Sequence, residues 1–200
     1  MPIKLITGFA FAIVLTAYTN SAISRDFNYD FFQGTYLSTT DSSLGVDVDG
    51  KGFSVGGSFS VSPAVAINVL YGTMSFDRVL GLDIDSTEFD FGVTVHTPAG
   101  PGTDIVGSFT IINAEVEVSD GFNTASDDDI GNGMSFSIRH MLSDNTELNV
   151  GVTRWDIFDD TSTVMSIGAR FYSNEKVSFG AAYSTVDDVD TISFSLRIEQ

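Results

Sequence analysis

The sequence predicts an all-β protein, a single antiparallel up-and-down transmembrane β-barrel of ten strands. Apolar and small polar residues alternate along many segments. In 53–61, for example, one face carries Phe53, Val55, Phe59 and Val61 while serine and glycine occupy the other. Lysine and glutamate, which are common on helix surfaces, are scarce. Strands with an apolar face and a small polar face are typical of a closed barrel in lipid, apolar outside and polar inside.

Residues 1–24 are expected to be a cleaved secretory signal peptide. An apolar stretch at 3–18 follows Lys4 and precedes a small-x-small site that ends at Ser24. The stretch is shorter than the roughly 20 residues that a membrane-spanning helix needs. We expect cleavage after Ser24, with Ala22 as the alternative, so that the mature protein begins near Arg25 and residues 25–200 form one outer-membrane barrel domain.

The composition excludes several classes of protein. A formal net charge of −18 argues against a nucleic-acid partner. With 42% hydrophobic and only 18% charged residues, the chain is not of the disordered type. It has no cysteine, which excludes a lipid-modified cysteine and a disulfide framework. No later segment is apolar for long enough to be a membrane helix, so a spanning protein has to be a barrel.

The alternation predicts ten strands, each about as long as a tilted strand needs to be to cross the hydrocarbon. Their expected spans are 29–39, 52–62, 65–76, 87–97, 104–117, 132–142, 146–158, 162–172, 176–186 and 190–199. Eight strands is the alternative, because the alternation is weak in 29–39 and in 104–117.

The connections fall into two alternating sets. One set holds nearly all the aspartate, at 41–50, 77–85, 119–131, 159–160 and 187–190. The other set is 62–63, 97–102, 143–145 and 173–175. This alternation predicts long acidic outer loops and tight inner turns, with both termini on the inner side. The acidic loops offer weak, non-dedicated sites for divalent cations, although 47–52 lacks the first and last ligands of an EF-hand.

The last strand also shows the alternation, with Ile192, Phe194, Leu196 and Ile198 on one face. In this respect the chain resembles the small outer-membrane β-barrel proteins of Gram-negative bacteria, the group of the OmpA transmembrane domain, OmpX and Ail. The resemblance implies an integral protein of the cell outer membrane, in contact with membrane lipid and lipopolysaccharide. It also implies a last strand that the barrel-assembly machinery recognises. The chain departs from the group by lacking a terminal phenylalanine.

Charged residues on the predicted inward faces are the candidate functional site. Glu88 and Asp90 share the polar face of the fourth strand, and the polar faces of the sixth, eighth and tenth strands carry Arg139, Arg170 and Arg197. A buried charge is tolerated when it is paired and hydrogen-bonded. We therefore expect several of these residues to meet in a network that plugs the lumen and holds the strands in register.

An enzyme is not expected, and neither is a cofactor or a dedicated metal site. An omptin-like protease needs a histidine with aspartates at the outer rim, and a lipid A deacylase needs a serine and a histidine about two residues apart. His96 and His140 instead fall near inner strand ends. The predicted function is therefore a non-catalytic outer-membrane barrel with a structural or surface-interaction role, and a narrow porin-like channel is the alternative.

Aromatic residues near the predicted strand ends are expected to form girdles at the membrane interfaces. They are Tyr29, Phe31, Phe32, Tyr36, Phe76, Trp155, Phe158, Phe171 and Tyr172.

Overall fold

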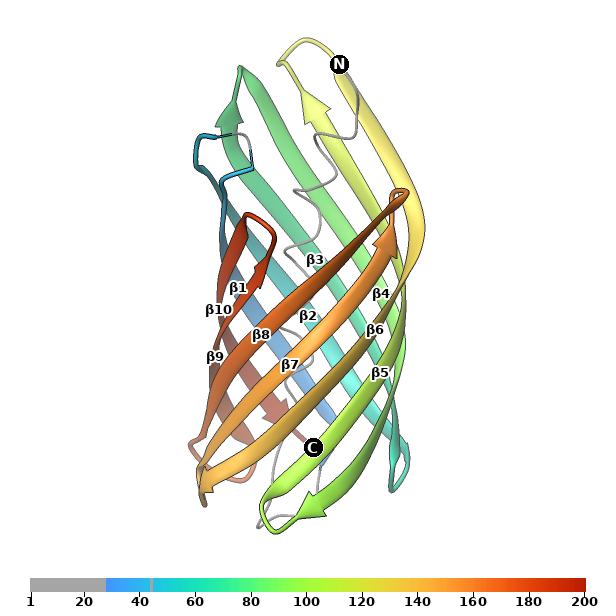
Figure 1. Cartoon of the computed structure of the whole chain (residues 1–200), viewed down its shortest axis with the longest axis vertical. Coiled ribbons are helices and arrows are strands. Elements are labelled where there is room, and N and C mark those ends of the chain that lie inside the picture. Colours follow the sequence, from blue (N-terminus) through green and yellow to red (C-terminus); the bar gives the residue numbers. More distant parts are fainter. Residues whose placement is uncertain (1–27, 44) are drawn as a thin grey trace.

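The computed structural model describes residues 28–43 and 45–200, and their strands close into one barrel (Figure 1). The ten strands are β1 (Phe31–Asp41), β2 (Val48–Ser62), β3 (Val65–Val79), β4 (Leu82–Gly100), β5 (Thr103–Ser119), β6 (Thr124–Ser143), β7 (Thr146–Ile157), β8 (Asp160–Tyr172), β9 (Val177–Val186) and β10 (Val189–Glu199). Each strand pairs antiparallel with the next, and β1 pairs with β10. The predicted ten-strand barrel is confirmed, and the eight-strand alternative is wrong. Over the described residues, no helix has the length and apolar character needed to cross a membrane.

Four of the five outer connections are shorter than the sequence predicted. Only residues 80–81 separate β3 from β4, and only 187–188 separate β9 from β10, whereas the connection between β7 and β8, at 158–159, has the predicted two residues. The backbone φ angles are positive at Leu80 and Gly81, and also at Phe158 and Asp159. Two consecutive positive φ angles are the signature of the type I′ turn, which matches the twist of a hairpin. Most of the residues expected in long acidic loops therefore belong to strands, and the acidic segment from Thr124 onward is part of β6.

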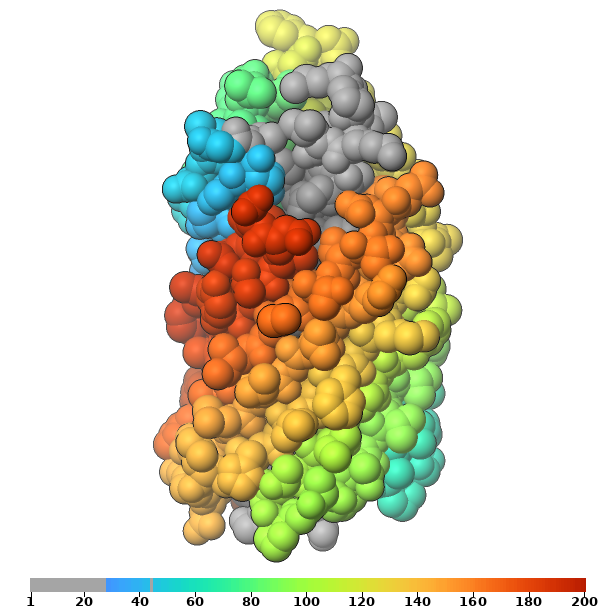
Figure 2. Space-filling view, viewed as in Figure 1, coloured from blue at the N-terminus to red at the C-terminus, as the bar shows by residue number. Residues whose placement is uncertain are grey.

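The barrel wall is uneven in height because the strands differ in length. β4, β5 and β6 have 19, 17 and 20 residues, whereas β9 and β10 have 10 and 11. In Figures 1 and 2 the β5–β6 hairpin, drawn in yellow, forms the highest point of the rim, and the β9–β10 hairpin, drawn in red, ends far below it. One side of the barrel thus reaches well beyond the other.

The inner part of the barrel has the surface of a membrane protein. Phe59, Phe136 and Phe194 point outward and are 40%, 48% and 57% exposed, which confirms the predicted parity. Of their neighbours, Ser58 is buried, and Ser137 and Ser195 are partly buried on the inward face. The lipid-facing band is apolar and the lumen beside it is polar, as expected for a barrel in a bilayer.

Replacing Phe136 with arginine is expected to lower the free energy of unfolding by roughly 2–4 kcal/mol, because the charge would face lipid. Asn132→Arg is the matched control, since Asn132 is an exposed outward residue of the same strand, four residues closer to the rim. Urea titration of both variants in lipid vesicles measures the difference. Equal losses would mean that the apolar band does not end between these two positions.

The pattern of the strands inverts above this band. In β7 the outward residues are Leu148, Val150 and Val152 and then the charged Arg154 and Asp156. The inward residues of the same strand change in the opposite sense, from Glu147, Asn149, Gly151 and Thr153 to Trp155 and Ile157. β3, β4 and β5 invert in the same way. The outer part of the barrel therefore has a polar outside and an apolar inside, which is the arrangement of a barrel in water.

The inverted part has a hydrophobic core of its own. Buried apolar residues from all strands except β6 pack together there: Leu37, Val48, Met74, Phe76, Ile84, Ile112, Ala114, Val116, Trp155, Ile157, Val164, Val186 and Val189. β6 contributes glycines instead. Trp155 lies against Gly133, its direct partner across the β6–β7 pair, and a Cβ atom at Gly133 would collide with the indole. Gly50 makes similar room for the ring of Phe76, 2.7 Å from where its Cβ would be.

This core corrects part of the predicted aromatic girdle. Phe32, Tyr36 and Phe171 face outward as expected. Phe158 lies between β7 and β8 and packs, partly buried, against the outer core. By contrast, Phe76 and Trp155 belong to the outer core, and Tyr29, Phe31 and Tyr172 are buried at the inner end. These five were misplaced because closeness to a strand end does not determine which face a residue occupies.

Candidate functional site

The inner end of the lumen holds a cluster of buried charged and polar side chains, which we call the inner polar cluster. It contains three of the predicted residues, Arg139 on β6, Arg170 on β8 and Arg197 on β10, all essentially inaccessible to solvent. It also contains residues that were not predicted: Tyr29, Gln33, Asp104, Glu147 and Tyr172. The topology brings them together because the inner ends of neighbouring strands are joined by tight turns.

Arg139 and Glu147 form the central ion pair of the cluster. The Arg139 Nε donates to Glu147 Oε1 at 2.7 Å, and a terminal nitrogen of the same guanidinium lies 2.6 Å from that oxygen. The second carboxylate oxygen of Glu147 accepts a 2.7 Å hydrogen bond from the Tyr172 hydroxyl. Both Glu147 oxygens are therefore engaged, as a buried carboxylate requires. The group ties β6, β7 and β8 together.

Arg170 and Arg197 converge on Gln33 of β1. The Gln33 Oε1 accepts from Arg170 Nη2 at 2.9 Å and from Arg197 Nη2 and Nε at 2.9 and 3.1 Å. Arg170 also donates to Ser178 and Ser195, at 3.1 and 3.2 Å. The Arg197 guanidinium lies 3.9 Å from the centre of the Phe31 ring, a cation–π contact. These contacts cross the junction where the barrel closes, between β10 and β1.

A third group lies beside the ion pair and involves a histidine. The Tyr29 hydroxyl donates to Asp104 Oδ2 at 2.8 Å, and the His96 ring stacks on the Tyr29 ring at 3.7 Å. His96 Nδ1 is 3.7 Å from the same Asp104 oxygen. His96 thus faces the lumen, whereas His140 faces outward and is hydrogen-bonded to Thr103.

The predicted acids Glu88 and Asp90 lie elsewhere. Across β5, Asp90 pairs with Ile112 while Arg139 pairs with Asp104, eight residues away along that strand. Eight residues of strand span roughly 26 Å. Among the described residues, no ion pair joins either acid to an arginine, and Glu88 Oε1 and both carboxylate oxygens of Asp90 are buried without a hydrogen-bond partner. The structure therefore brings the three arginines together with Glu147 and Gln33, and leaves Glu88 and Asp90 closer to the outer core.

Glu147 could have been identified from the sequence as a lumen residue. It stands at an inward position of the alternation that continues through Asn149, Gly151 and Thr153. Gln33 carries no charge and gave no such signal. The predicted cleavage site at Ser24 and Arg25 lies outside the described residues.

The outer rim is acidic and its turns are ordered by hydrogen bonds. The Asp120 carboxylate accepts the backbone N–H groups of Asn123 and Phe122, each at 2.7 Å, and these bonds lower the pKa of Asp120. In the part of the chain that the structure describes, no group of three or more histidine, cysteine, aspartate or glutamate side chains is placed to hold a metal ion. The acidic residues of the rim are thus spread over the surface instead of being gathered into one centre.

Comparison with solved structures places this fold among known proteins. The translocator domain of the autotransporter NalP from Neisseria meningitidis matches with a TM-score of 0.53 and 12% identity, covering 98% of this chain and 94% of that one. The beta domain of the Bordetella autotransporter Brka matches with a TM-score of 0.55 and 12% identity, covering 84% and 98%. Neisserial surface protein A also matches, with a TM-score of 0.49, 12% identity and coverage of 85% and 96%.

These similarities define the fold: the chain is built as an outer-membrane β-barrel, as the sequence resemblance implied. No protein-family model matches the chain, and no curated protein matches it.

Proposed function

We propose that the protein is a non-catalytic, non-conducting barrel of the outer membrane whose tall acidic rim takes part in surface interactions. The observation that carries this proposal is the inversion of the strands. The apolar interior of the outer part is a poor path for ions, because a hydrophobic constriction excludes water. At the other end of the lumen, buried and interlocked charges occupy the space. Both features favour a closed barrel over the porin-like alternative.

The outward surface above the apolar band supports a role at the cell surface. Exposed carboxylates gather on the extended parts of the walls, among them Asp49, Asp85, Glu115, Glu117, Asp128 and Asp156. Such a surface attracts divalent cations, which can bridge it to anionic lipopolysaccharide. The last strand, β10, is the element that the barrel-assembly machinery would recognise. Proteins, cations and lipopolysaccharide are thus the proposed partners.

Conductance across a planar lipid bilayer tests the proposal. The purified protein is expected to give no steady, resolvable openings. The double variant Trp155→Ala and Arg139→Ala removes one large side chain from the outer core and one from the inner polar cluster. It is expected to give openings more often than the unmodified protein. Steady openings of the unmodified protein would overturn the proposal and favour the narrow channel. Heat-modifiable migration on a gel confirms in each case that a folded barrel was inserted.

A further inference from the structure

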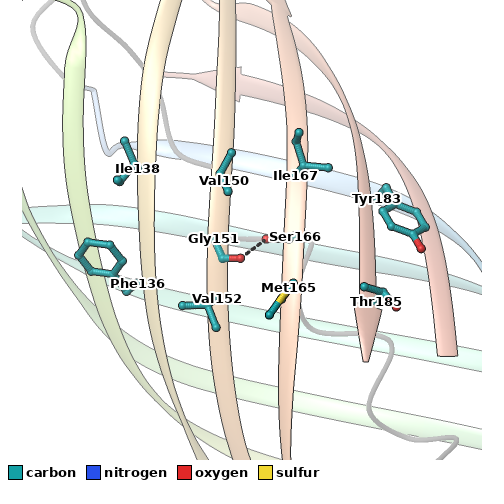
Figure 3. Close-up of a pocket in the computed structure, with 10 residues that line it drawn as sticks. All are labelled: Phe136, Ile138, Val150, Gly151, Val152, Met165, Ser166, Ile167, Tyr183 and Thr185. Carbon is teal, nitrogen blue, oxygen red and sulfur yellow. Dashed lines mark hydrogen bonds between the residues drawn. The ribbon is translucent and has the colours of Figure 1, made fainter. Parts of the chain in front are cut away.

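A groove of about 420 Å³ runs along the lipid-facing side of β6, β7, β8 and β9 (Figure 3). Its sides are formed by Phe136 on β6 and Tyr183 on β9, with the shorter Val150 and Val152 between them. At its floor the backbone is exposed at Gly151, whose carbonyl accepts a hydrogen bond from Ser166. The groove lies within the apolar band, where its surroundings are acyl chains.

Arg154 lies at the outer end of this groove. Arg154 is the next outward residue after Val152 on β7, and its neighbour across the β7–β8 pair is Thr163. Arg154 is exposed, and among the described residues no carboxylate lies within ion-pair distance of it. The apolar band ends at this height, because Val152 is apolar and the next outward position after Arg154 is Asp156. Arg154 therefore lies at the level of lipid headgroups.

The position of Arg154 is unusual on this protein. The outward surface above the band is acidic and repels phosphate. Arg78 is neutralised by Asp83 at 2.7 Å. Lys51 is an exposed outward cation on β2, on another side of the barrel, and lines no part of the groove. Among the cations of residues 28–43 and 45–200, Arg154 is the one whose outward position on its strand directly follows a residue that lines the groove.

We propose that the groove and Arg154 together bind one phosphorylated glycolipid of the outer leaflet, with an acyl chain along Val150 and Val152 and a phosphate on the Arg154 guanidinium. Arginine donates two parallel hydrogen bonds to a phosphate, and the side-chain hydroxyl of Thr163 lies beside it. The inference rests on the proposed outer-membrane location and names the lipid site of that barrel. It does not depend on whether the lumen conducts.

The probe is diphosphoryl lipid A, added to the purified barrel in detergent and followed by native mass spectrometry. Arg154→Ala is expected to weaken binding roughly tenfold, the effect of losing one charge-assisted contact. Val152→Trp fills the groove and is expected to weaken binding to a similar degree. Lipid A without its phosphates should bind equally to the unmodified protein and to Arg154→Ala.

Lys51→Ala is the matched control, because it removes an exposed outward cation away from the groove. The proposal is overturned if Lys51→Ala and Arg154→Ala weaken binding equally, or if Val152→Trp leaves binding unchanged in a barrel that still shows heat-modifiable migration. If Val152→Trp instead abolishes a dimer seen in the mass spectrum, the occupant is a second copy of the chain and the lipid assignment is wrong. The bilayer conductance of the unmodified protein tests the proposed function independently of all these outcomes.

Discussion

Replacing Glu147 with alanine is expected to lower the free energy of unfolding by roughly 3–5 kcal/mol, the cost of breaking a buried ion pair by removing one partner. Glu147 accepts hydrogen bonds from both Arg139 and Tyr172, so a single substitution takes the acceptor from two donors on two other strands. Denaturant titration in lipid vesicles measures this loss. Asn149→Ala is the control, since Asn149 is the next inward residue of β7 and its side-chain oxygen has no hydrogen-bond partner.

A double-mutant cycle measures the interaction energy between Arg139 and Glu147 separately from their contacts with other residues. Because Arg139 and Glu147 are in direct contact, the double variant Arg139→Leu and Glu147→Leu is expected to lose clearly less than the sum of the two single variants. Arg139→Ala combined with Glu88→Ala or Asp90→Ala should instead give the plain sum, because these acids form no ion pair with Arg139. Strong coupling of Arg139 to Glu88 or Asp90, with none to Glu147, would restore the charge network as the sequence predicted it.

The number of strands and the direction of their faces could be predicted because alternation is a local property. Each outward Phe59, Phe136 or Phe194 has its inward serine neighbour in the same few residues. The arginines of the lumen were found by the same parity. Their partners were not, because pairing depends on how far each strand is shifted against the next, and that shift is a property of the closed barrel. Glu88 and Arg139 share the inward parity and yet lie at different depths.

The inversion of the strands could have been found in the sequence, but it was hidden by an assumption. Aspartates were taken to mark loops, so segments such as 119–131 were removed from the strands that they belong to. In fact the alternation continues through part of them with its polar and apolar faces exchanged, as at the buried Ile84 and the exposed Asp85 of β4, whereas residues 124–130 of β6 are exposed almost throughout. An aspartate at every second position is as compatible with a strand in water as with a loop. On each strand that shows it, the exchange of the two faces marks the position where the apolar band ends.

The outer core supplies the second large effect. Trp155→Ala is expected to lower the free energy of unfolding by roughly 3–5 kcal/mol, because it empties a buried site that neighbouring strands cannot close. Trp155 is 2% exposed and packs within the cluster of apolar residues from nine strands. Arg154→Ala is the control, because Arg154 is the adjacent residue and faces outward. The Arg154→Ala control keeps Trp155, the single tryptophan of the chain. Its fluorescence during urea unfolding therefore reports directly on the unfolding of the outer core.

Gly133 provides a stricter test of that packing. A side chain at Gly133 would collide with the Trp155 indole, so Gly133→Val is expected to destabilise the barrel by about 1–3 kcal/mol, as overpacking does. In the Trp155→Ala background the same substitution should cost much less, because the ring that it meets is gone. Gly107→Val is the control, since the nearest atom to a Cβ there is a backbone oxygen at 3.9 Å. If Gly133→Val costs the same with and without the indole, Trp155 does not pack against β6, and the outer part of the lumen is open enough to reconsider a channel.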